Sequence, residues 1–168
     1  MAACSSGAAG GPTTTTEAPA TQLFNSGLSA EQQARYQQGV NDFEAVLQLQ
    51  PRSYLAAYDL GVADTALKRT SAAAAAYRRA LSVNPKFRSA LYNLALLYSS
   101  GEPARAVPLF AKLEVIDPRD PNVEFNFGLV LEHVGRVKAG ESQLTAALKA
   151  EPSLKRQIPK GTTLPKGA

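Results

Sequence analysis

Residues 52–85, RSYLAAYDLGVADTALKRTSAAAAAYRRALSVNP, contain one complete copy of a unit that recurs along this chain of 168 residues. Each copy ends in a proline, and the prolines are 34, 33 and 34 residues apart: Pro51, Pro85, Pro118 and Pro152. A small residue stands 12 positions before each proline: Gly39, Ala73, Ala106 and Gly140. A bulky apolar residue stands eight positions before each: Phe43, Tyr77, Phe110 and Leu144. A period of this length predicts a supersecondary unit copied along one axis, each copy burying its apolar face against the next.

Within each unit the apolar residues follow helical spacing twice, with a polar break between the two runs. In residues 52–85 the first run is Leu55, Tyr58, Val62 and Ala66, and the second is Ala73, Tyr77, Ala80 and Leu81. The break covers residues 68–71, where Thr70 or Ser71 is expected to cap the second helix. In the later units, helix starts and ends are expected at Gly101, Pro103, Asp120–Pro121 and Gly135. The sequence therefore predicts an all-α protein built from helix pairs.

The units divide the chain into three parts. Residues 1–28, rich in Ser, Gly and Thr, are expected to form a flexible tether, and residues 153–168 a basic flexible tail. Between them, the complete units are 52–85, 86–118 and 119–152. Before Pro51 only one helix is expected, roughly residues 29–50, starting with Ser29 and Gln32 at capping-box spacing. This partial unit, residues 29–51, would follow a coil and cap the repeat array.

The repeat resembles the tetratricopeptide repeat family on specific residues. The first half of the family pattern, Leu-Gly with an aromatic, is carried by Leu60-Gly61, Leu94-Ala95 with Tyr98, and Phe127-Gly128. The second half, Ala with an aromatic and Pro, is carried by Ala73, Tyr77 and Pro85. The resemblance covers about residues 29–152 and implies a right-handed α-solenoid of antiparallel helix pairs with about three and a half repeats. It also implies a non-catalytic module that binds a protein or peptide.

Two features depart from the family pattern. The Trp of the family's first helix is replaced by Ala57, Leu91 and Glu124. The third unit is one residue short at the turn between its helices, and it carries Pro108 inside its second helix, where a proline favours a kink.

The resemblance places the first helices on a concave lining, where a row of aromatic and amide side chains could hold a peptide. The aromatic row is Tyr58, Tyr92 and Phe125; the residues that follow it are Asp59, Asn93 and Asn126; and the apolar row is Val62, Leu96 and Leu129. Aromatic rings supply contact area and amides pair with a peptide backbone. The same residues could equally pack between repeats, and both interpretations stay open here. The chaperone-binding members of the family use Lys and Asn rows, and these faces lack Lys, so that activity is not carried over.

No enzyme or nucleic-acid site is indicated by the sequence. His133 is the only histidine, and no set of ligands or catalytic partners accompanies it, so no metal, cofactor or reaction is expected. The net charge of +4 comes largely from the C-terminal tail, because residues 21–154 hold 14 basic and 13 acidic residues. A nucleic-acid-binding protein would show a basic face on its folded part.

Cys4, the only cysteine, stands after Ala2-Ala3 and before a Ser/Gly/Thr-rich run. These residues resemble the cleavage site of bacterial lipoproteins, whose cysteine becomes lipidated. The resemblance implies an extracytoplasmic, membrane-anchored protein acting in assembly of cell-envelope complexes, and restored upstream codons should encode a basic start and an apolar run. The alternatives are an unmodified Cys4 in a cytoplasmic adaptor, or a structural scaffold that self-associates.

Overall fold

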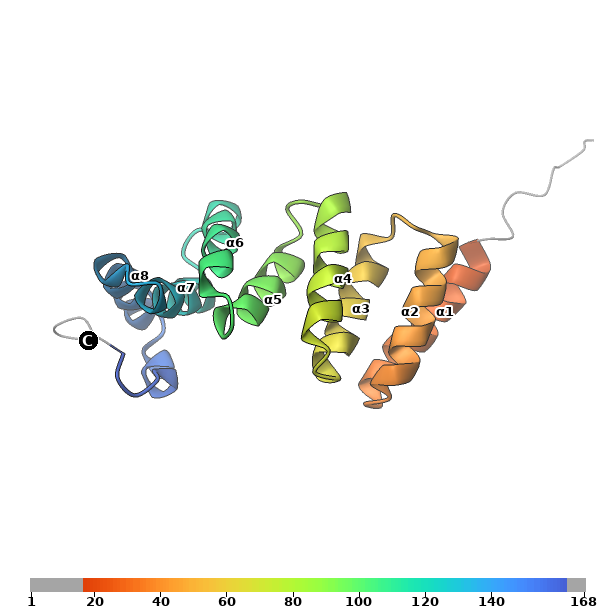
Figure 1. Cartoon of the computed structure of the whole chain (residues 1–168), viewed down its shortest axis with the longest axis horizontal. Coiled ribbons are helices and arrows are strands. Elements are labelled where there is room, and N and C mark those ends of the chain that lie inside the picture. Colours follow the sequence, from red (N-terminus) through yellow and green to blue (C-terminus); the bar gives the residue numbers. More distant parts are fainter. Residues whose placement is uncertain (1–16, 163–168) are drawn as a thin grey trace, which may run out of the picture.

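The computed structural model describes residues 17–162 of the chain, and over these residues the protein consists of helices and connecting turns. The helices are α1 Glu17–Gln32, α2 Tyr36–Leu49, α3 Tyr54–Ala66, α4 Thr70–Val83, α5 Arg88–Ser99, α6 Pro103–Ile116, α7 Pro121–His133, α8 Val137–Ala150 and the 3-10 helix η1 Pro152–Gln157. Consecutive helices pair as α1–α2, α3–α4, α5–α6 and α7–α8, and the pairs follow one another in a row (Figure 1). The predicted solenoid of antiparallel helix pairs is therefore confirmed.

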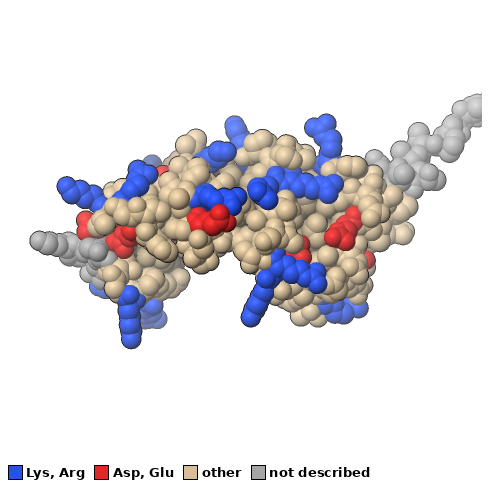
Figure 2. Space-filling view, viewed as in Figure 1, with Lys and Arg blue, Asp and Glu red and all other residues tan. Residues whose placement is uncertain are grey.

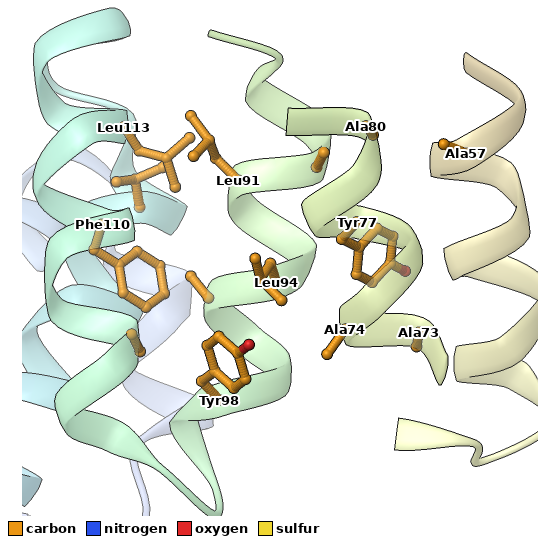
Figure 3. Packing of buried hydrophobic residues seen from close by; sticks show 14 of the residues in the cluster. Ala57, Ala73, Ala74, Tyr77, Ala80, Leu91, Leu94, Tyr98, Phe110 and Leu113 are labelled. Atoms are coloured by element: carbon orange, nitrogen blue, oxygen red, sulfur yellow. The ribbon is translucent and has the colours of Figure 1, made fainter. Parts of the chain in front are cut away.

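The apolar residues of neighbouring pairs form one continuous core. Tyr77 of α4 is 1% exposed and points between α3 and α5 (Figure 3). Leu91 and Leu94 of α5 lie between α4 and α6, where they meet residues such as Phe110 and Leu113. The two inner pairs, α3–α4 and α5–α6, have a neighbouring pair on both sides, so an isolated pair would leave apolar residues exposed to water.

Small residues on the first helices let the second helix of each pair approach closely. A Cβ atom placed on Gly61 would lie 2.5 Å from Cε1 of Tyr77, and one on Gly27 would lie 2.6 Å from Cε1 of Phe43. At Gly128 the nearest atom would be Cγ of Leu144, at 2.8 Å. The glycine of the first helix and the bulky residue eight positions before the proline are therefore two sides of one contact.

The turns inside the pairs explain the short third unit. In three pairs, the residue between the helices has a positive φ: Ala34 at 56°, Lys68 at 59° and Gly135 at 79°. The next residue donates its N–H to the carbonyl five positions back, as Arg69 does to Asp64 at 2.8 Å. In the third pair Glu102 instead donates to Tyr98, four positions back, at 2.8 Å. The turn between the helices of the third pair therefore needs one residue fewer than the turns of the other three pairs.

Most predicted helix boundaries after residue 50 are found, except the cap of α4. Asp120 caps α7 by accepting bonds from the N–H groups of Asn122 and Val123, and Pro103 opens α6. Neither Thr70 nor Ser71 caps α4, so that prediction is wrong. The N-cap residue is Arg69, and no side chain accepts a hydrogen bond from the first N–H groups of α4. Pro108 lies within α6, which runs unbroken from Pro103 to Ile116.

The prediction that residues 1–28 form a flexible tether is wrong for residues 17–28. They belong to α1, which pairs with α2, so the described part of the chain has four helix pairs and the predicted partial unit 29–51 is the rest of a complete one. Ser29 is inside α1, where it accepts a bond from Gln33 and caps nothing. The signal was present in the sequence: Gly27 precedes Pro51 by 24 residues, as Gly61 precedes Pro85.

The prediction that residues 153–168 form a flexible tail is wrong for residues 153–158. Leu154 in η1 is 2% exposed and packs with Leu144, Ala147, Leu148 and Phe125, and Ile158 joins this cluster. This segment therefore covers the end of the helix row.

Candidate functional site

The nine residues predicted to line a groove lie on α3, α5 and α7, which are first helices of their pairs. We call the surface that α1, α3, α5 and α7 present the first-helix face. A hollow of about 510 Å³ opens on it between α3 and α5. Its lining includes Val62, Asn93 and Leu96, so three predicted residues meet in one depression. Leu96 is 38% exposed, which leaves an apolar side chain available to a partner.

Six further residues line the hollow and were not predicted to do so from the sequence: Thr65, Ala66, Thr70, Tyr77, Leu97 and Ser100. The hydroxyl of Thr65 donates to the carbonyl of Gly61 at 2.7 Å and lies 3.0 Å from the hydroxyl of Tyr77. Because a hydroxyl has one hydrogen, Tyr77 is the donor to Thr65. Thr65 lies seven residues after Tyr58 on the same helix face, and this spacing is the signal that would have found it. The hollow thus combines apolar walls with fixed hydroxyl groups.

The predicted tyrosines and asparagines bond to each other across repeats. The side-chain amide of Asn93 donates to the hydroxyl of Tyr58 at 3.3 Å, and that of Asn126 donates to Tyr92 at 3.0 Å. Asn126 also donates to the carbonyl of Asn122 at 2.8 Å, so both its amide hydrogens are used within the protein. Burial raises the pKa of Tyr58 and of Tyr92. This row therefore takes part in packing between repeats, and only its exposed edges remain for a ligand.

Two residues of the predicted row lie under the C-terminal segment. Phe125 is 3% exposed because it is packed in the cluster around Leu144 and Leu154, and Leu129 packs against the same cluster. The prediction of a ligand contact at Phe125 is therefore wrong. The accessible part of the predicted site lies on α3 and α5.

Two carboxylates on the first-helix face lie in an environment that disfavours their charge. Burial raises the pKa of Glu31 on α1 to about 7, and the charge of Asp59 on α3 contributes to the increase. Burial also raises the pKa of Asp59 to about 6. Asp59 was among the predicted residues, whereas Glu31 was missed because its neighbour in space lies 28 residues away in the sequence.

We expect these two carboxylates to make the protein more stable at about pH 5 than at about pH 8. Their pKa values in the folded state lie above the ordinary values of 4.5 and 3.8. Between the two sets of values the folded protein binds more protons than the unfolded protein, so the free energy of unfolding falls as the pH rises. Thermal melting curves recorded between about pH 5 and about pH 8 should show a melting temperature that falls as the pH rises.

A double variant and a matched control make this prediction specific. Glu31→Gln with Asp59→Asn should remove much of the pH dependence, whereas Glu141→Gln, which alters an acid on α8, should leave it unchanged. An unaltered pH dependence in the double variant would show that these groups titrate normally in the folded protein.

Charge is unevenly divided between first and second helices. The first helices contain one Lys or Arg, Arg88, and six acids: Glu17, Glu31, Asp59, Asp64, Glu124 and Glu132. The second helices α2, α4, α6 and α8 contain six Lys or Arg residues and four acids: Arg78, Arg79, Arg105, Lys112, Lys138 and Lys149, with Asp42, Glu44, Glu114 and Glu141. Figure 2 shows Lys and Arg spread over the visible face of the molecule rather than gathered in one patch.

The described residues hold no group of three His, Cys, Asp or Glu side chains arranged for a metal ion. Within the same residues, no helix combines the length and apolar character needed to cross a bilayer. Cys4, the predicted lipid attachment site, lies outside the part of the chain that the structure describes.

Comparison with known proteins decides the family. The sequence model of the tetratricopeptide repeat matches residues 24–81 and 65–121, which together span more than half of the chain. The chain belongs to the tetratricopeptide repeat family. No curated protein matches it by sequence.

Solved tetratricopeptide repeat structures are similar over most of the chain. A crystal structure of MamA is 25% identical, with a TM-score of 0.75, and the match covers 83% of this chain and 81% of that one. MamA from Desulfovibrio magneticus RS-1 is 21% identical, with a TM-score of 0.73 and coverage of 82% and 78%. YrrB, described as a tetratricopeptide repeat protein with an unusual peptide-binding site, is 19% identical, with a TM-score of 0.73 and coverage of 83% and 75%. These likenesses establish the fold.

Proposed function

We propose that this protein is a non-catalytic scaffold that binds a protein or peptide segment on its first-helix face, at the hollow between α3 and α5. The observation that carries the proposal is the hollow itself, about 510 Å³ in volume, with the exposed Leu96 and the half-buried Val62 and Asn93 in its lining. Apolar walls with a few placed polar groups are the usual composition of a binding site. YrrB, which shares the fold, is described as having a peptide-binding site.

The test begins with a library of random peptides of about twelve residues, a length able to cross several repeats when extended. Peptides selected on the immobilised protein would be labelled, and their dissociation constants measured by fluorescence anisotropy. Leu96→Arg should weaken binding by about tenfold or more, because it puts a charged side chain into the apolar wall of the hollow.

The matched control is Val115→Arg, which adds the same charge at a residue of α6 that is 83% exposed and lies outside the hollow. The control should bind the peptides as the unaltered protein does. Equal binding by the Leu96 and Val115 variants would contradict the proposed site.

We propose further that the scaffold is held at a membrane by a lipid on Cys4 and acts in assembly of cell-envelope complexes. The proposal rests on Ala2-Ala3-Cys4 and the Ser/Gly/Thr-rich run that follows them. The protein expressed with its upstream codons should partition into detergent, and Cys4→Ser should return it to the aqueous phase, because the variant lacks the thiol that carries the lipid. Upstream codons without an apolar run, or a Cys4→Ser protein that still partitions into detergent, would refute the anchor.

A further inference from the structure

We infer that the segment bound on the first-helix face pairs a basic side chain with an apolar one. Its ammonium or guanidinium group lies beside Glu31 and Asp59, and its apolar side chain enters the hollow at Val62 and Leu96. This inference rests on the proposed function, because it names the chemistry of the segment that the same face would bind.

Glu31 and Asp59 are partly buried acids with strongly raised pKa values, and neither has a cation as partner among the described residues. Elsewhere Asp64 pairs with Arg69, Glu102 with Arg105, and Arg88 with both Asp117 and Asp120. Neither Glu31 nor Asp59 takes part in an ion pair within residues 17–162, and Oε1 of Glu31 is buried without a hydrogen-bond partner there. A buried carboxylate oxygen without a partner is costly. A cation supplied by a ligand beside the half-exposed side chains of Glu31 and Asp59 would stabilise their charged forms.

The groups that face the two carboxylates leave their charge uncompensated. Tyr58 of α3 interacts electrostatically with both, and Tyr77 of α4 with Glu31. Asn93 of α5 approaches through its bond to Tyr58, and on α2 a Cβ placed on Gly39 would lie 3.4 Å from Cγ of Glu31. None of these groups is a cation. The only Lys or Arg on a first helix, Arg88, is held by Asp117 and Asp120.

The two carboxylates and the hollow are close enough to contact neighbouring side chains of one bound peptide segment. Asp59 precedes Val62 by three residues of α3, a rise of about 4.5 Å along the helix. Side chains on one face of an extended peptide are two residues apart, which is about 6.6–6.8 Å. The expected motif is therefore Lys or Arg two positions from Leu, Ile or Phe.

The peptide library also tests this inference. It is selected in parallel on three proteins, and the selected pools are sequenced. The three proteins are the unaltered chain, the double variant Glu31→Gln with Asp59→Asn, and a control variant with Glu44→Gln and Glu141→Gln. The control removes the same number of negative charges from second helices, at α2 and α8. The unaltered protein and the control should enrich Lys or Arg two positions from an apolar residue. The double variant should lose the basic enrichment and keep the apolar one.

The dissociation constant of one enriched peptide gives a second readout. We expect about tenfold weaker binding to the double variant, and a similar loss when the peptide's basic residue is replaced by Gln. Binding to the unaltered protein should strengthen from about pH 5 to about pH 8, because the carboxylates attract a cation only when ionised, and the double variant should lack this trend.

The outcomes separate the inference from the proposed function. Pools enriched only in apolar residues, or basic enrichment that survives in the double variant, would overturn the inference while Leu96→Arg still tests the hollow. A library that yields no binding peptide on any of the three proteins would overturn both.

Discussion

Gly61→Leu is expected to destabilise the protein by about 1–3 kcal/mol, the usual cost of inserting extra methylene groups into a filled core. A Cβ atom at this position would already lie 2.5 Å from Cε1 of Tyr77 and 2.6 Å from its Cδ1. Tyr77 is 1% exposed and lines the hollow between α3 and α5, so its ring can give way only by leaving its packed position and losing its hydrogen bond to Thr65. The substitution therefore has to separate α3 from α4 or displace the Tyr77 ring.

Urea unfolding followed by circular dichroism measures this effect, and Gly101 supplies the control. A Cβ atom on Gly101 would meet nothing within 4 Å, so Gly101→Leu should change the stability by less than about 0.5 kcal/mol. If the Gly61 and Gly101 variants unfolded at the same urea concentration, the close contact between α3 and α4 would not exist.

Leu154→Ala is expected to cost about 2 kcal/mol, at the lower end of the range for a buried leucine, because a segment near the chain end can partly refill the space. Leu154 is 2% exposed and lies against Leu144, Ala147 and Leu148 of α8. In a repeat protein each unit is stabilised mainly by its neighbours. The loss should therefore fall on the last helix pair.

Hydrogen exchange gives the location of that loss. Amide protection in α7 and α8 should decrease in the Leu154 variant, while protection in α1–α4 stays unchanged. Gln157→Ala, which alters an exposed residue of the same η1 segment, should leave both regions as they are. Unchanged protection of α7 and α8 in the Leu154 variant would mean that residues 152–158 do not cap the helix row.

The repeated positions made most of the fold predictable from sequence. Proline ends a unit because it cannot continue a helix. The small residue about 24 positions before each proline and the bulky residue eight positions before it identify the contact within each pair. Both kinds of signal are local, so they can be read without knowing how the pairs stack. The ends of the array were harder. Gly27 follows Ser26 where other units have Leu or Phe, and Leu154 is followed at once by Lys155-Arg156, so both ends were mistaken for coil.

The candidate site was predictable only in part, because its contacts join different repeats. The spacing of Tyr58, Val62 and Thr65 shows that they share a helix face. The spacing cannot show that Asn93 bonds to Tyr58, 35 residues away, or that Glu31 lies near Asp59. Those contacts depend on the rotation between successive pairs. Likewise, Phe125 has the same repeat position as Tyr58 and Tyr92, and the repeat pattern does not indicate that the C-terminal segment covers it.

The most direct test of binding on the first-helix face is nuclear magnetic resonance of the isotope-labelled protein during titration with a selected peptide. Amide signals of residues around the hollow should shift first and furthest, among them Val62, Thr65, Asn93 and Leu96, together with Glu31 and Asp59. Signals from exposed residues of α6 and α8, and from those of α4 outside the hollow lining, should stay in place. Shifts confined to those second helices, with the first-helix face unchanged, would contradict the proposed binding surface.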